Sequence, residues 1–148
     1  MKLKALILTA LVAVIAPLSV TGQAPQKGDV FIPISKYLSQ GDVQSLSAWF
    51  ADNLEISIIS STNDTSKKQA RQILKSFFDA HTPRAFEITH QASSSNMKYA
   101  LGSLTAGGEI YQVTIFLNLK DDAYQIQQFK IDRITYEFGT RLAITSIG

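Results

Sequence analysis

The 148-residue sequence contains no cysteine. This absence excludes a disulfide framework, a thiolate metal site, a cysteine nucleophile and a lipidated cysteine. Hydrophobic residues make up 45% of the chain and charged residues 18%, a balance that excludes an intrinsically disordered or fibrous protein. The length suits one domain with a single hydrophobic core.

Neither sign of charge dominates the chain. There are 14 Lys and Arg against 12 Asp and Glu, and the excess is accounted for by Lys2 and Lys4. A nucleic-acid surface needs several basic side chains placed against phosphates, but the densest basic group falls on one expected helix and is better explained as its solvated face. That group consists of Lys67, Lys68, Arg71 and Lys75. We therefore expect no nucleic-acid partner.

No apolar run reaches the roughly 20 residues that a membrane-spanning helix needs. The longest run, over residues 5–18, follows Lys2 and Lys4. A positive start, a short apolar middle and small residues near its end predict a signal peptide over residues 1–22, with cleavage near 22–24. Residues 23–28 are then a polar linker. We expect an exported protein, periplasmic or secreted, with no stable membrane anchor after cleavage.

Motifs that identify a catalytic or phosphate-binding site are also missing. The chain has no G-x-S-x-G nucleophile elbow and no glycine-rich phosphate loop. Its two histidines, His81 and His90, have no Asp, Glu or second His at metal-ligand spacing. We expect no metal and no cofactor, and the sequence favours a protein that is not an enzyme.

Two helices are expected at the start of the mature chain. Helical spacing of apolar residues predicts the first over residues 29–40, ended by Gly41. Asp42 is placed to cap a short second helix, with Trp49 and Phe50 on its apolar stripe.

The clearest helix of the sequence comes next. Residues 51–53 are expected to end the second helix, a strand follows over 54–59, and 60–65 is a polar turn. A helix over 66–81 then begins at a capping box headed by Ser66, and its apolar residues recur at i, i+3, i+4, i+7 and i+8.

Alternating apolar residues predict strands in the rest of the chain. The expected strands cover 86–92, 97–101, 111–119 and the segment from Tyr124 onward. Residues 106–108 are an expected hairpin turn, and residues 120–122 are an expected polar turn. The apolar face switches near Gln127 and Gln128, which predicts either a β-bulge or a two-sided environment there.

The expected order is ααβαββββ, which places the protein in the α+β class. About three N-terminal helices are expected to pack on a curved, mostly antiparallel sheet, in a single domain over 29–135. This arrangement resembles the nuclear transport factor 2-like fold, also called the cystatin-like α+β cone. Residues 136–148 form a C-terminal tail to which the sequence assigns no structure.

Several segments match a more specific pattern. They are residues 30–37 (VFIPISKY), 41–42 (GD), 46–55 (LSAWFADNLE), Ala70, 72–79 (QILKSFFD), 97–100 (MKYA) and 106–109 (AGGE). On these segments the chain resembles a family of exported bacterial proteins of the Bacteroides–Flavobacteria group, whose domain is of unknown function and has the nuclear transport factor 2-like fold. The resemblance implies the fold and export; it implies no activity and supplies no catalytic residue.

Folds of this group often hold a pocket between the helices and the sheet. The residues expected to line it are Trp49, Phe50, Phe78, Tyr99, Tyr111 and Gln127. The alternative for the aromatic members is a packed core. A buried carboxylate in such a pocket has a raised pKa and can act as a base. The carboxylate candidates are Asp52, Glu55 and Glu87. The other candidate catalytic groups are Tyr99, Tyr111, His81 and His90.

Three functions remain open on the sequence. The first is a non-catalytic exported domain that binds a small hydrophobic ligand or a protein partner. The second is a small enzyme of the isomerase or hydratase type that uses a buried carboxylate or histidine. The third is an interaction module that forms a homodimer through its sheet.

Overall fold

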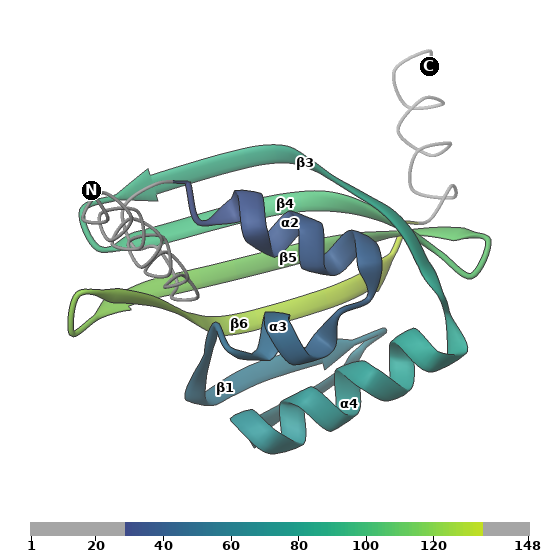
Figure 1. Cartoon of the computed structure of the whole chain (residues 1–148), viewed down its shortest axis with the longest axis horizontal. Helices are drawn as coiled ribbons and strands as arrows, with labels where there is room; N and C mark the ends of the chain where they lie inside the picture. The colour runs from purple at the N-terminus through teal and green to yellow at the C-terminus, as the bar shows by residue number, and fades with distance from the viewer. Residues whose placement is uncertain (1–28, 135–148) are drawn as a thin grey trace, which may run out of the picture.

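The structure is a computed structural model, and it describes residues 29–134. Three helices lie against one face of a curved, six-stranded sheet (Figure 1), so the predicted α+β class is confirmed. The predicted signal peptide (1–22), the linker (23–28) and the tail (136–148) lie outside the described residues. The elements are α2 (Phe31–Gln40), α3 (Val43–Ser47), β1 (Phe50–Ile58), β2 (Ser61–Ser66), α4 (Lys67–Ala80), β3 (Pro83–Ser94), β4 (Met97–Ala106), β5 (Glu109–Lys120) and β6 (Ala123–Arg133).

The sheet is mostly antiparallel, as predicted. Its strand order is β2-β1-β6-β5-β4-β3, and the neighbours β1 and β6 form a parallel pair. Ile56 of β1 lies opposite Phe129 of β6, and Ile58 lies opposite Ile131. This pairing joins strands that are far apart in sequence. It connects the β1–β2 hairpin to the antiparallel strands β3–β6.

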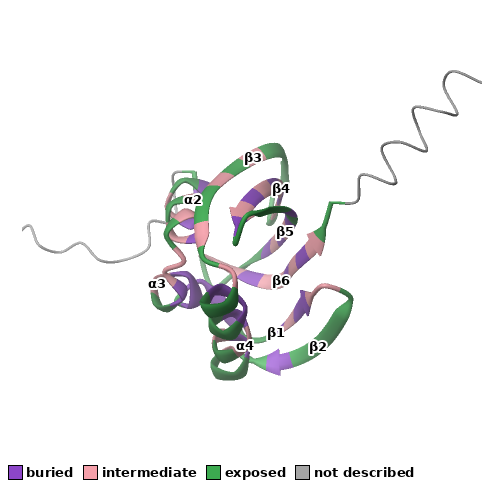
Figure 2. Ribbon diagram, turned by 90° about the vertical axis from the view of Figure 1, so that its right-hand side faces the viewer, coloured by how far each residue is buried: buried purple, intermediate pink, exposed green. Residues whose placement is uncertain are grey.

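The core lies between the helices and the concave face of the sheet. Figure 2 shows the helices together on one side, with buried residues recurring along β4, β5 and β6. Alternate residues of these strands face the helices, which is the period-two pattern of a half-buried sheet. Fully buried members of the core include Ile34, Leu38, Leu46, Ile56, Leu74, Leu104, Ile115, Leu117, Ile126 and Phe129.

Both predicted turns are present, and the β-bulge occurs, which was one of the two alternatives near Gln127 and Gln128. Gly107 and Gly108 have φ of 57° and 83°, and the two residues after β5, Asp121 and Asp122, also have positive φ. Two consecutive positive φ values match the twist of the flanking strands in a tight hairpin. In the β5–β6 pair, Phe116 lies opposite Gln128 and Leu117 lies opposite Ile126, which leaves Gln127 as the extra residue of a bulge.

The segment predicted as a polar turn over 60–65 is instead strand β2. Its residues pair with β1, and only Thr65 of the six is buried. The turn before it consists of Ile59 and Ser60, with φ of 45° and 71°. A β-branched residue at positive φ gives no local turn signal, and a polar edge strand shows no apolar alternation. Pairing with β1 decides the conformation.

The second helix is shorter than predicted, and residues 51–53 belong to a strand. α3 ends at Ser47 and β1 begins at Phe50. The Ile126 amide donates to the Trp49 carbonyl at 2.7 Å, and Phe50 lies opposite Ile126. Helical spacing of Trp49 and Phe50 therefore misled, because pairing with β6 fixes their backbone.

Candidate functional site

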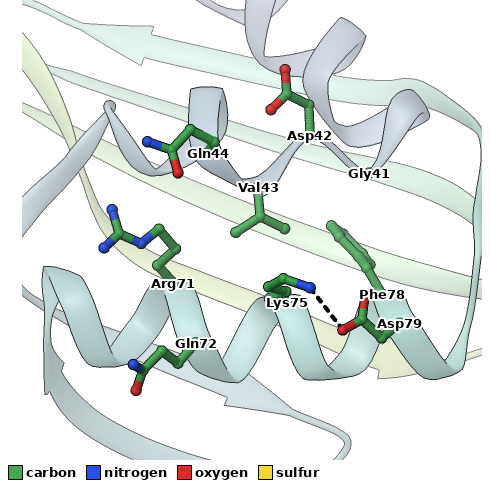
Figure 3. Close-up of a pocket in the computed structure, with 9 residues that line it drawn as sticks. All are labelled: Gly41, Asp42, Val43, Gln44, Arg71, Gln72, Lys75, Phe78 and Asp79. Carbon is green, nitrogen blue, oxygen red and sulfur yellow. Dashed lines mark hydrogen bonds and ion pairs between the residues drawn. The ribbon is translucent and has the colours of Figure 1, made fainter.

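A surface groove lies between the α2–α3 corner and α4 (Figure 3). It has a volume of about 300 Å³, at the small end of ligand pockets. Residues 41–44 form one wall and α4 forms the other. The two walls face each other because α3 packs against α4. The lining residues are Gly41, Asp42, Val43, Gln44, Arg71, Gln72, Lys75, Phe78 and Asp79.

The α4 wall follows from the amphipathic pattern of that helix. Ser66 caps it, with its hydroxyl accepting from the Gln69 amide at 3.1 Å. The apolar residues of α4 face the core, so the polar residues at i, i+4 and i+8 line the groove. These are Arg71, Lys75 and Asp79.

The opposite wall depends on a sharp corner between two helices. Gly41 ends α2 in the left-handed region, with φ of 69°, and a Cβ built there would lie 3.0 Å from the Pro83 ring. Asp42 then caps α3, since its carboxylate accepts from the Ser45 amide at 3.1 Å and from the Ser45 hydroxyl at 2.7 Å. This corner turns Val43 toward α4 (Figure 3).

The charges that line the groove are unequally compensated. Lys75 and Asp79 form an exposed ion pair at 2.9 Å. Arg71 is half-buried and forms no ion pair with any residue of the described range 29–134. Val43 and Phe78 are both buried and provide an apolar floor beneath these polar groups. The groove therefore combines an uncompensated guanidinium with an apolar surface.

Four of the six residues expected to line a pocket belong to the packed core: Trp49, Phe50, Phe78 and Tyr111. At 1% exposure, Phe50 and Tyr111 are among the largest fully buried side chains. Phe78 also lines the groove. Of the other two, Tyr99 is half-exposed on β4 and Gln127 is the half-exposed bulge residue of β6. These core aromatic side chains are buried between the helices and the sheet.

The carboxylates expected as possible bases do not meet in one place. Asp52 and Glu87 are exposed on β1 and β3. Glu55 is half-buried and accepts a hydrogen bond from the Gln128 amide nitrogen at 3.0 Å. His90 is exposed, and its ring lies edge-on to Tyr99 at 6.4 Å.

His81 and Tyr111 do meet, at the C-terminal end of α4. The His81 ring stacks on Phe77 at 4.4 Å, and its Nδ1 donates to the Phe77 carbonyl at 3.0 Å. Tyr111 contacts both rings edge-on, and its buried hydroxyl has no hydrogen-bond partner in the described part of the chain. Burial raises the pKa of Tyr111 above 10.0; the negative Glu109 carboxylate adds to the rise, and the Arg133 guanidinium opposes it in part. This phenol stays protonated at neutral pH.

Within residues 29–134 no group of three or more acidic, His or Cys side chains is placed to hold a metal ion. In the same range, no helix is both long and apolar enough to cross a membrane. The groove has no signal in the sequence. The charge pattern predicted that Arg71 and Lys75 lie on a solvated helix face, and no local pattern shows that α4 lies beside α3.

The sequence profile of the domain of unknown function DUF4783 matches residues 31–132, which is more than half of the chain. The chain belongs to the DUF4783 family. The family suggested by the sequence segments is thereby confirmed. A search of curated proteins finds no match to this DUF4783 chain.

Solved structures share the fold of this DUF4783 domain. A DUF4783 protein from Bacteroides uniformis has a TM-score of 0.70 at 21% identity, covering 72% of this chain and 99% of its own. A cystatin-like domain of unknown function from Nostoc punctiforme has a TM-score of 0.59 at 14% identity, with 80% and 82% covered. An NTF2-like protein of unknown function from Cytophaga hutchinsonii has a TM-score of 0.56 at 7% identity, with 78% and 96% covered. These likenesses show the nuclear transport factor 2-like fold.

Proposed function

We propose that this DUF4783 domain is a non-catalytic binding domain of an exported protein, and that its ligand site is the groove between α3 and α4. The observation that carries the proposal is the half-buried Arg71, which lines a cavity of about 300 Å³ without an ion-pair partner in the described range. Binding sites combine an apolar lining with a few polar groups that orient the ligand, and this groove has both.

The packing of the concave face supports a site outside it. Trp49, Phe50 and Tyr111 occupy the space between helices and sheet as part of one core. A ligand there would have to displace side chains that pack at the density of a protein interior. A ligand in the groove would displace only solvent.

The placement of the candidate bases supports the absence of catalysis. An acid–base enzyme needs a titratable group beside the space where its substrate sits. Among the groove residues, Asp79 is paired with Lys75 and the Asp42 carboxylate is held by Ser45. Sheet-mediated homodimerisation remains a prediction of the sequence analysis.

Proton–nitrogen correlation NMR tests the proposal. The labelled protein is titrated with a mixed library of small neutral, anionic and cationic compounds. We expect binders to shift the amide signals of residues 41–44 and 71–79. Gln44→Trp, an exposed groove residue, should weaken these shifts by covering the cavity, whereas Ser76→Trp, exposed on α4 outside the groove, should leave them intact. A library whose binders shift only other regions would reject the groove as the site.

A further inference from the structure

We infer that the groove selects a small carboxylate, with the carboxylate bound by Arg71 and the apolar part of the ligand resting on Val43 and Phe78. The inference depends on the proposed function, because it assigns a ligand class to the same groove. Of the two cations that line the groove, Lys75 already has a carboxylate partner in Asp79.

Arg71 suits a carboxylate better than a simple point charge would. Its planar guanidinium presents parallel N–H donors that match the two oxygens of a carboxylate, and it is weakly hydrated compared with an ammonium group. Figure 3 shows the Arg71 side chain rising from α4 toward the Gln44 side of the groove. The Gln44 amide can donate a further hydrogen bond to an anion held there.

The acidic residues of the groove do not oppose this assignment. Asp79 is compensated by Lys75 and lies eight residues from Arg71, which is about 12 Å along the helix and about one screening length at moderate salt. The Asp42 carboxylate accepts two hydrogen bonds from Ser45, and in Figure 3 it points away from the floor of the groove.

The floor and the volume define the rest of the ligand. Val43 reaches down from α3 and Phe78 rises from α4, and both are buried. Because both are already buried, an aromatic or aliphatic group resting on them removes mainly its own apolar surface from water. A cavity of about 300 Å³ limits that group to a small ring or a short chain.

Phenylacetate is a probe of this class, and phenylacetamide is its neutral counterpart of nearly equal shape. We expect phenylacetate to bind the full-length protein in the groove with a roughly millimolar dissociation constant. It should bind about tenfold more tightly than phenylacetamide, because a charge-assisted hydrogen bond adds to the same apolar contact. Phenethylammonium and inorganic phosphate should bind more weakly than phenylacetate. NMR titration of amides 41–44 and 71–79 measures all four.

Two variants test whether the preference for phenylacetate over phenylacetamide depends on Arg71. Arg71→Gln should reduce phenylacetate affinity about tenfold and leave phenylacetamide unchanged. Lys68→Gln removes an exposed cation of the same helix that does not line the groove, and it should change neither. Circular dichroism confirms that both variants fold, and the comparison of probes on the unaltered protein does not depend on them.

The outcomes separate the two proposals. Equal affinity for phenylacetate and phenylacetamide would overturn the carboxylate preference and leave the groove as a ligand site. Phosphate binding as tightly as phenylacetate would show that the groove recognises anions without an apolar part, which also overturns the inference. If no probe and no library compound shifts the groove amides, both proposals fail.

Discussion

Tyr111 shows how a single residue combines a favourable and an unfavourable contribution. Its ring packs edge-on against Phe77 at 5.3 Å and against His81 at 5.9 Å. Aromatic pairs at such distances are stabilising. Its hydroxyl, however, is buried with no partner in the described part of the chain, and an unsatisfied buried polar group costs free energy.

We expect Tyr111→Phe to leave the free energy of unfolding at neutral pH unchanged or to raise it by up to about 1 kcal/mol. The variant should also lose an alkaline destabilisation. Because burial raises the pKa of Tyr111 above 10.0, the unfolded chain releases this proton first as pH rises. Ionisation of Tyr111 therefore leaves the free energy of unfolding unchanged below pH 10.0 and lowers it as pH rises through the pKa of the folded state.

Urea unfolding at a series of pH values from neutral to strongly alkaline measures both effects. Tyr99→Phe is the matched control, because it makes the same chemical change at a half-exposed tyrosine. A Tyr111→Phe variant with the same alkaline slope as the parent would show that another group causes it.

Helix α4 is the element that joins core and groove. One face supplies the buried Leu74 and Phe77, and another supplies Arg71 and Lys75 to the groove. Its N-terminus is held by Ser66, whose hydroxyl accepts from the amide at the third helical position. Local sequence therefore sets where this helix begins and which residues each face presents.

Ser66→Ala should lower the free energy of unfolding by about 1 kcal/mol, because the amide it satisfies becomes unpaired. Ser76→Ala replaces an exposed serine in the same helix and should change stability by less than about 0.5 kcal/mol or raise it slightly. The midpoint of urea unfolding at constant m-value distinguishes the two. Equal losses for both variants would argue against a specific capping role.

For the whole molecule, the parallel pairing of β1 with β6 is the longest-range feature. It brings Phe50–Ile58 beside Ala123–Arg133. The β3–β6 strands, in contrast, pair as successive antiparallel neighbours. Closing a long loop costs entropy before its contacts form, so the meander is expected to assemble before β1 joins it.

Ile115→Val and Ile56→Val test this order with the same chemical change, since both side chains are fully buried. Each should cost about 0.5–1.5 kcal/mol. We expect Ile115→Val, in the meander, mainly to slow folding, and Ile56→Val, in β1, mainly to speed unfolding. Stopped-flow folding in urea measures both rates. A larger folding-rate effect for Ile56→Val would reverse the proposed order.

Much of the fold could be predicted because its signals are local. The Ser66 cap, the Gly107–Gly108 turn and the bulge at Gln127 each follow from a few adjacent residues. Strand β2 and the early end of α3 could not be predicted in this way. Strand β2 depends on pairing with its hairpin neighbour β1, although its own residues show no apolar alternation. The end of α3 depends on the hydrogen bond from the distant Ile126 to Trp49.

The candidate site was harder to predict than the fold. The aromatic residues expected around a pocket were correctly recognised as apolar, but sequence spacing does not show whether a cavity remains between them or is filled. Arg71 is one of several basic residues on α4, and only the packing of α3 against α4 distinguishes it from the exposed Lys68.

Local patterns in the chain predicted the α+β class, the caps of α3 and α4 and most turns, because periodicity and capping operate within a few residues. The family was indicated by the resemblance of several segments. Tertiary structure alone decided that β1 pairs with β6, that Ile59 adopts positive φ, and that a groove lies beside Arg71. Those outcomes depend on which strands pair and on which helix faces pack together. Distant segments share hydrogen bonds and buried surface only after the chain has folded.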